Sequence, residues 1–149
     1  MKHMTIVEAL KEKNQLVRNI LELQNRISSY NCVIEGNPRA YDPKEVMAEL
    51  NNTIEELISI KTRITRANQP VQEKIYRLSE LKTQIRFLKN IPTTEGKAPL
   101  GKSLYSKSET YVWESSIKTQ ERDKSVVELG NEISKIQQEL DAHNYKTTI

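Results

Sequence analysis

The fold is decided by the stretch from Asp42 to Lys89, which has the sequence DPKEVMAELNNTIEELISIKTRITRANQPVQEKIYRLSELKTQIRFLK. Its apolar residues recur at steps of three and four, as on one face of a helix. They are Met47, Leu50, Ile54, Leu57, Ile58 and Ile64, and then Val71, Ile75, Leu78, Leu81, Ile85 and Leu88. Pro70 lacks a backbone donor and disfavours helix at the residue before it. The pattern therefore predicts helices over 43–68 and 70–90, folded back on each other at Asn68-Gln69-Pro70.

Two further helices flank this stretch. Thr5 and Glu8 have the spacing of a capping box, which predicts a first helix over 5–31. The last helix, over 116–143, is predicted from strict heptad spacing of its apolar residues. These are Val126, Leu129, Ile133, Ile136 and Leu140. Between the third and last helices, residues 91–114 form a loop and an extended segment, because residues 104–113 alternate with the period of a short strand.

Composition limits the kind of core that these helices can build. The 149 residues are 36% hydrophobic and 29% charged, with one Phe and one Trp, so the core is aliphatic and thin. Helices that bury only a narrow stripe form elongated pairs or small bundles. We therefore predict one all-α domain over residues 1–149. It is an antiparallel, coiled-coil-like bundle of about four helices, with a short extended or β insertion before the last helix.

Charge is unevenly distributed along the chain. Residues 61–107 contain 11 Lys or Arg and 3 Asp or Glu, whereas the chain as a whole has a net charge of +3. One interpretation is a surface for nucleic acid or anionic lipid. The other is a basic third helix that packs beside an acidic last helix. We expect at most weak polyanion binding and no specific nucleic-acid partner, because the stretch has few aromatic residues to stack on bases.

The sequence also bears on location. No apolar run approaches the roughly 20 residues of a membrane span, and no hydrophobic signal-peptide core lies at the N-terminus. Cys32 is the single cysteine and cannot form an internal disulfide. These features predict a cytoplasmic protein without a transmembrane segment.

Several short segments carry a family resemblance. They include Glu8-Ala9-Leu10, the run from Val33 to Pro38, the run from Ile64 to Asn68, and Tyr105-Ser106-Lys107-Ser108-Glu109. In this order they resemble the septicolysin-like family of small helical bacterial proteins, which has no established molecular function. The resemblance implies a bacterial helical protein. The family's name implies cytolysis, so a peripheral membrane-active protein is an alternative function.

One segment matches a nucleotide-binding pattern. Residues 96–103 fit G-x-x-x-x-G-K-[ST] through Gly96, Gly101, Lys102 and Ser103. The segment before it is not an apolar strand, Pro99 removes a possible amide donor, and the residues after it favour an extended chain over a helix. We therefore predict no bound nucleotide here, and keep a nucleotide-binding enzyme as a second alternative.

No other pattern predicts chemistry. His3 and His143 lie near the two ends, and no cluster of His, Cys, Asp or Glu has metal-ligand spacing. We predict no catalytic residue, no cofactor and no metal. The hypothesis is a non-enzymatic structural or protein-interaction protein with an unknown protein partner. Because narrow stripes leave apolar surface uncovered, we also predict a homo-oligomer.

Overall fold

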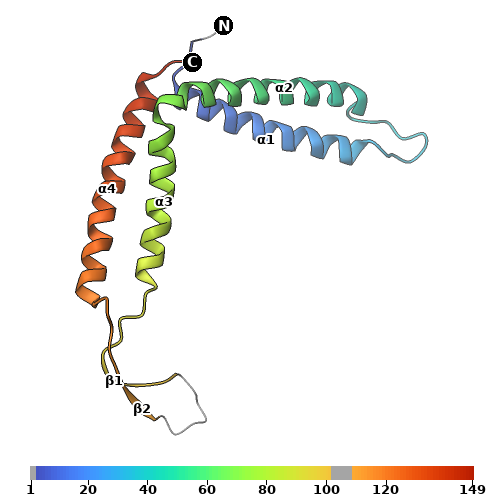
Figure 1. Cartoon of the computed structure of the whole chain (residues 1–149). Coiled ribbons are helices and arrows are strands. Elements are labelled where there is room, and N and C mark those ends of the chain that lie inside the picture. The colour runs from blue at the N-terminus through green and yellow to red at the C-terminus, as the bar shows by residue number, and fades with distance from the viewer. Residues whose placement is uncertain (1–2, 102–108) are drawn as a thin grey trace. The chain divides into compact units, whose positions relative to one another are not determined.

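The computed structural model describes residues 3–101 and 109–149 (Figure 1). It is mostly helical, with a small two-stranded antiparallel sheet. The helices are α1 (Ile6–Tyr30), α2 (Pro43–Asn68), α3 (Gln72–Lys89) and α4 (Thr119–Lys146), and the 3₁₀ turn η1 (Gln69–Val71) joins α2 to α3. The strands β1 (Gly96–Pro99) and β2 (Thr110–Trp113) precede α4. The chain divides into two compact units, Met1–Gln72 with Asp141–Ile149, and Glu73–Leu140.

This architecture confirms the helical class and the β insertion before the last helix. A single four-helix bundle is not confirmed, because both clusters of buried residues lie between α1 and α2. The expected hairpin of α2 with α3 is not confirmed either, since α2 packs on α1 and the ion pairs of α3 run to α4. The last helix begins later and ends later than the predicted range of 116–143. The assignment of 1–149 to one domain stays a prediction.

In the first unit, both helices begin with the caps that the sequence predicts. The Glu8 amide donates to Thr5 Oγ1 at 3.3 Å, and the Thr5 amide donates to Glu8 Oε2 at 2.8 Å, which completes the capping box. At α2, the Lys44 amide donates to Asp42 Oδ1 at 2.9 Å, and Pro43 is the first helical residue. Each cap pairs an amide that has no partner within the helix.

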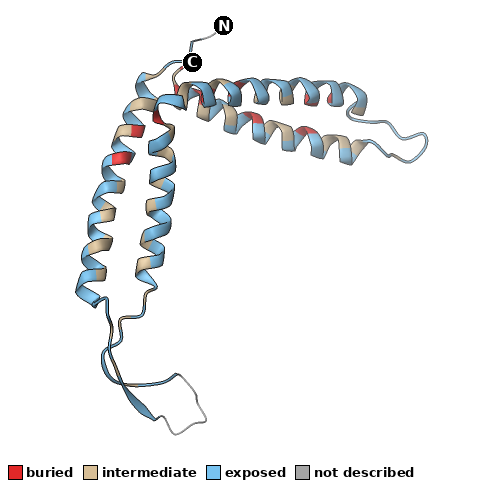
Figure 2. Ribbon diagram, viewed as in Figure 1, coloured by how far each residue is buried: buried red, intermediate tan, exposed pale blue. Residues whose placement is uncertain are grey.

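The α1–α2 pair is antiparallel, and two apolar clusters hold it together (Figure 2). One cluster joins the start of α1 to the end of α2 and contains Met4, Ala9, Leu16, Ile60 and Ile64. The other joins the end of α1 to the start of α2 and contains Leu23, Val46 and Leu50. The partly buried Ile149 packs against the first cluster. The side chains between α1 and α2 are called the seam below.

The seam on α2 differs in part from the predicted stripe. Met47 and Ile58 are 43% and 51% exposed, whereas Val46 and Ile60, which the prediction omitted, are 6% and 3% exposed. The buried residues Val46, Leu50, Ile60 and Ile64 fall on one heptad repeat, which also contains Thr53 and Leu57. A helix that faces one antiparallel partner buries this narrow repeat, so the apolar residues beside it stay exposed.

The residues before α1 and the residues after α4 pair with each other. The Ile149 amide donates to Met4 O at 2.8 Å, and the Ile6 amide donates to Thr147 O at 3.0 Å. His143 Nε2 lies 3.1 Å from Ala67 O, at the end of α2. A carbonyl oxygen only accepts, so Nε2 carries the proton in this contact. Residues 144–148, which lie beyond the predicted end of the last helix at 143, are therefore helical or paired with the N-terminal segment.

In the second unit, α3 and α4 run side by side (Figure 1) and are joined by ion pairs. Lys74 Nζ lies 3.0 Å from Glu139 Oε2, and Arg77 Nη1 lies 4.0 Å from Glu132 Oε1. The predicted stripe of α3 is half-buried throughout, at Ile75, Leu78, Leu81, Ile85 and Leu88. On α4, Ile136 and Leu140 are buried. This unit thus has a shallower seam than the α1–α2 pair.

A short hairpin lies between α3 and α4. β1 and β2 pair antiparallel, with Gly96 opposite Trp113 and Pro99 opposite Thr110. The sequence predicted β2 within an extended segment that would need a partner, and β1 supplies it from the preceding loop. Of that segment, residues 104–108 lie outside the described residues.

Candidate interaction surfaces

The base of the β1–β2 hairpin forms an apolar cleft of about 600 Å³. Its lining includes Ile91, Pro92, Pro99, Trp113 and Ile117. The indole Nε1 of Trp113 donates to Ala98 O at 3.0 Å, which fixes the ring across the hairpin. Small-molecule pockets are commonly this apolar, but they also bury most of the ligand, and this cleft is wide open.

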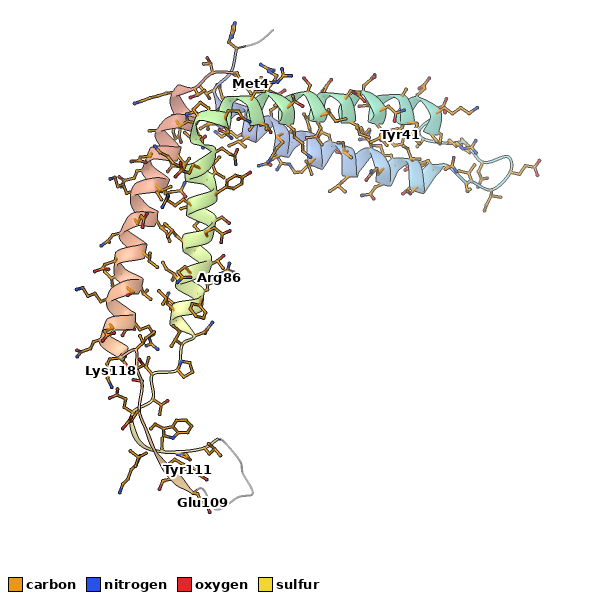
Figure 3. The ribbon with its side chains drawn as sticks, viewed as in Figure 1. Met4, Tyr41, Arg86, Glu109, Tyr111 and Lys118 are labelled. Carbon is orange, nitrogen blue, oxygen red and sulfur yellow. The ribbon has the colours of Figure 1, made fainter. Side chains whose placement is uncertain are left out.

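A polar network holds the two chain segments together beneath this cleft. Glu95 accepts hydrogen bonds from Lys118 Nζ and, at 2.8 Å, from Ser115 Oγ. The Lys118 hydrogen bond, and then that of Ser115, lowers the pKa of Glu95 below its ordinary value of 4.5. Figure 3 labels Lys118 next to the hairpin. Ser115 therefore binds Glu95 before α4 begins.

Arg122 makes the second connection at this base. Its Nη1 donates to Ile91 O at 3.1 Å and to Thr93 Oγ1 at 3.4 Å. Thr119 Oγ1 donates to Thr93 Oγ1 at 2.8 Å. The first turn of α4 is thereby tied to the segment that leaves α3. These hydrogen bonds position the hairpin relative to α3 and α4. The polar side chains at its base therefore have a structural role.

The nucleotide-binding pattern falls on this hairpin. Gly96 begins β1 with a φ of 75°, Pro99 ends β1, and Gly101 is exposed. Gly96 thus lies in a strand, whereas a phosphate-binding loop places its glycines in a loop that opens a helix. Lys102 and Ser103 lie outside the described residues. The absence of a nucleotide site at Gly96, Gly101, Lys102 and Ser103 therefore stays a prediction.

The loop between α1 and α2 is ordered by Arg39 and two tyrosines. The Arg39 guanidinium donates to Tyr30 O at 3.1 Å and to Asn31 O at 3.2 Å, which pairs carbonyls at the end of α1. The rings of Tyr30 and Tyr41 meet edge to face with centroids 5.2 Å apart, and Tyr41 is labelled in Figure 3. Arg26 lies 4.8 Å from the centroid of the Tyr41 ring. Cys32 in this loop is exposed.

Part of the basic stretch is engaged within the second unit. Lys74 and Arg77 of α3 pair with Glu139 and Glu132 of α4, as one of the two sequence interpretations expected. These pairs flank the half-buried stripe of α3, which is the arrangement of charges beside a helix–helix seam. The weak polyanion binding predicted for residues 61–107 stays a prediction.

Large apolar side chains stand exposed on the outer surface of α1 and α2. Leu21 is 56% exposed, Ile58 51%, Met47 43% and Val17 40%. Single exposed apolar residues are common on protein surfaces. Here four of them lie on one helix pair, in addition to the residues that fill its seam.

The described residues include neither a metal-binding cluster nor a helix that could span a membrane. Within residues 3–101 and 109–149, no group of three or more His, Cys, Asp or Glu side chains could hold a metal ion. In the same ranges, no helix combines the length and apolarity that crossing a bilayer requires.

Comparisons with known proteins extend over nearly the whole chain. Residues 13–149 match the model of a family described as "Family of unknown function (DUF6847)". The chain belongs to this family. The function of this family is not known, and none of the comparisons shows the septicolysin-like link.

One solved structure adds to the family match. It is described as the crystal structure of a functionally unknown conserved protein from Corynebacterium diphtheriae, and is 19% identical with a TM-score of 0.77. The alignment covers 99% of each chain. At this identity the likeness shows the fold alone. None of the curated proteins matches the chain.

Proposed function

We propose that this member of the DUF6847 family is a non-enzymatic structural or protein-interaction protein that associates with copies of itself. The observation that carries the proposal is the exposure of Val17, Leu21, Met47 and Ile58 on a helix pair that already fills its own seam. Burying such side chains is the main favourable term in protein association.

The helix pairs support this role in a second way. Each half of the chain devotes its longest elements to antiparallel pairing, and the heptad spacing of the seam residues is that of coiled-coil-like packing. Helices with this pattern present long surfaces with few clefts, which suit a helical partner better than a small substrate. The partner proposed here is a second copy, and the location proposed is the cytoplasm.

Mass measurement over a dilution series tests this function. We expect light scattering coupled to size exclusion to give at least twice the 17.3 kDa of one chain at micromolar concentration. Dilution over about a hundredfold should then lower the mean mass, because association follows mass action. A mass of one chain at every concentration would refute self-association.

A further inference from the structure

One side of the α1–α2 pair carries a row of apolar side chains beside the seam. Helical geometry of 100° per residue places Leu10, Val17 and Leu21 about 100° around α1 from the seam. Met47, Ile54 and Ile58 lie about 100° around α2 from its seam, in the same rotational sense. In an antiparallel pair, residues displaced in the same sense lie on the same side of the pair. These six residues are called the apolar flank; Leu10 and Ile54 are half-buried against the two core clusters, and the other four are exposed.

The two halves of the flank also lie at matching levels along the pair. One core cluster combines Leu16 with Ile60, and the other combines Leu23 with Leu50. This register brings Val17 near the level of Ile58, and Leu21 near the level of Ile54. The flank is therefore continuous across both helices and is not a scatter of single residues.

Charge separates the two sides of the pair. The other positions on the side of the apolar flank are Asn14, Gln24 and Ser28 of α1 and Lys44, Asn51, Lys61 and Thr65 of α2. This side thus holds two lysines, one in the first turn of α2 and one level with Asn14, and it holds no carboxylate. The opposite side of the pair holds the carboxylates and guanidiniums. They are Glu8, Glu12, Glu22 and Arg26 of α1 and Glu45, Glu49, Glu56, Arg63 and Arg66 of α2. Such segregation is typical of bundle helices that contact more than one neighbour.

We infer that the apolar flank binds the same flank of a second copy, so that two α1–α2 pairs form a four-helix bundle across two chains. The inference rests on the proposed function and specifies the surface that performs it. The apolar flank extends from the level of Leu10 to that of Met47, about 26 Å along the pair and about 20 Å across it, which is an area on the order of 500 Å². The uncharged polar positions beside the flank extend this face toward the roughly 800 Å² that one partner buries in an interface of standard size.

A second copy fits this face because the face is complementary to itself. A two-fold contact places each patch against its own image, so a patch with many like charges would repel its image. Here the image of Leu21 or Ile58 is another uncharged side chain, and the carboxylates remain on the solvent side. The amides of Asn14, Gln24 and Asn51 both donate and accept, so they pair equally well with themselves.

The test combines two variants with a matched control, all in the full-length chain. Leu21→Glu with Ile58→Glu places four carboxylates in the interface of two copies, where burial of unpaired charge is costly. The control is Val127→Glu, because Val127 is also exposed (61%) but belongs to α4 in the second unit and not to the flank. Leu21→Gln with Ile58→Gln is a second, uncharged variant, and circular dichroism reports whether each protein keeps its helices.

We expect the unaltered chain and the Val127→Glu control to be dimers at micromolar concentration. The Glu double variant should be a folded monomer, with association weakened on the order of a hundredfold, and the Gln variant should be intermediate. A double variant that still dimerises would overturn this inference, although self-association itself would stand. An unaltered chain that is monomeric would refute both proposals.

Two other occupants of the flank would be recognised in the same experiments. If the unaltered chain is monomeric but co-sediments with vesicles of phosphatidylcholine and phosphatidylglycerol, the flank binds lipid and the inference is wrong. If the Glu double variant changes the hydrodynamic radius without changing the mass, the second unit of the same chain covers the flank, which also overturns it.

Discussion

The substitutions Ile60→Ala and Ile58→Ala test the register of the α1–α2 pair on a single helix. Both remove the same three carbon atoms from α2, and the positions are two residues apart. Ile60 is 3% exposed and belongs to the core cluster with Leu16 and Ile64, whereas Ile58 is 51% exposed. The heptad seam therefore predicts very different costs. A seam that contained Ile58, as the apolar spacing alone predicts, would reverse their order.

The expected costs follow from burial. Removing three buried carbons loses about 2.4 kcal/mol of transfer free energy, at about 0.8 kcal/mol for each. The cavity left at position 60 adds to this, so Ile60→Ala should cost about 3 kcal/mol. At Ile58 about half of the transfer term applies and no cavity forms, and the better helix propensity of Ala offsets part of the loss. The cost there should stay below about 1 kcal/mol.

Urea unfolding followed by circular dichroism measures both costs. For a slope of about 2 kcal/mol/M, a loss of 3 kcal/mol lowers the midpoint by about 1.5 M. The protein should be as dilute as detection allows, so that self-association adds little to the free energy of unfolding. Equal midpoints for the two variants, or a lower midpoint for Ile58→Ala, would refute the register described here.

Three further outcomes are expected. Asp42→Ala should cost about 1 kcal/mol in urea unfolding because the Lys44 amide loses its cap, whereas Asp42→Asn should retain most of that stability. The lowered pKa of Glu95 means that its contribution is complete above pH 4.5 and is lost as the pH falls through the lower, folded-state pKa. The fluorescence of Trp113, the single tryptophan, should therefore change in acid, and Glu95→Gln should abolish that transition. His143→Ala removes the donor to Ala67 O and should lower stability by about 1 kcal/mol, while His3→Ala should leave the melting temperature unchanged.

Local signals in the sequence predicted much of the helical fold. The Thr5–Glu8 box and the Asp42-Pro43 start lie within a few residues, so the sequence contains all of their partners. The burial of Ile136 and Leu140 also follows from their heptad spacing. The exchange of Met47 and Ile58 for Val46 and Ile60 was not predictable from spacing alone. Apolar residues cover a wide arc of α2, and only the position of α1 decides which part of that arc becomes the seam.

Contacts between residues distant in sequence were the least predictable. The strand character of 110–113 was visible, but its partner Gly96–Pro99 lies in a stretch rich in Gly and Pro that looks like loop. The binding of Thr147 and Ile149 to Ile6 and Met4 was missed because polar residues near a chain end usually fray. The apolar flank could have been found from the sequence, as the pattern Leu10, Val17, Leu21 beside the heptad of α1.

The pairing of residues 4–6 with residues 147–149 separates two stages of folding in time. During synthesis, α1 and α2 can pack as soon as residue 68 has left the ribosome, because both core clusters lie mainly within that length. Met4 and the side of its cluster that Ile149 covers must stay open until about eighty more residues have left the ribosome. The nascent α1–α2 pair is therefore packed along most of its length. The apolar cluster at the Met4 end stays exposed to solvent, and a chaperone could bind it there.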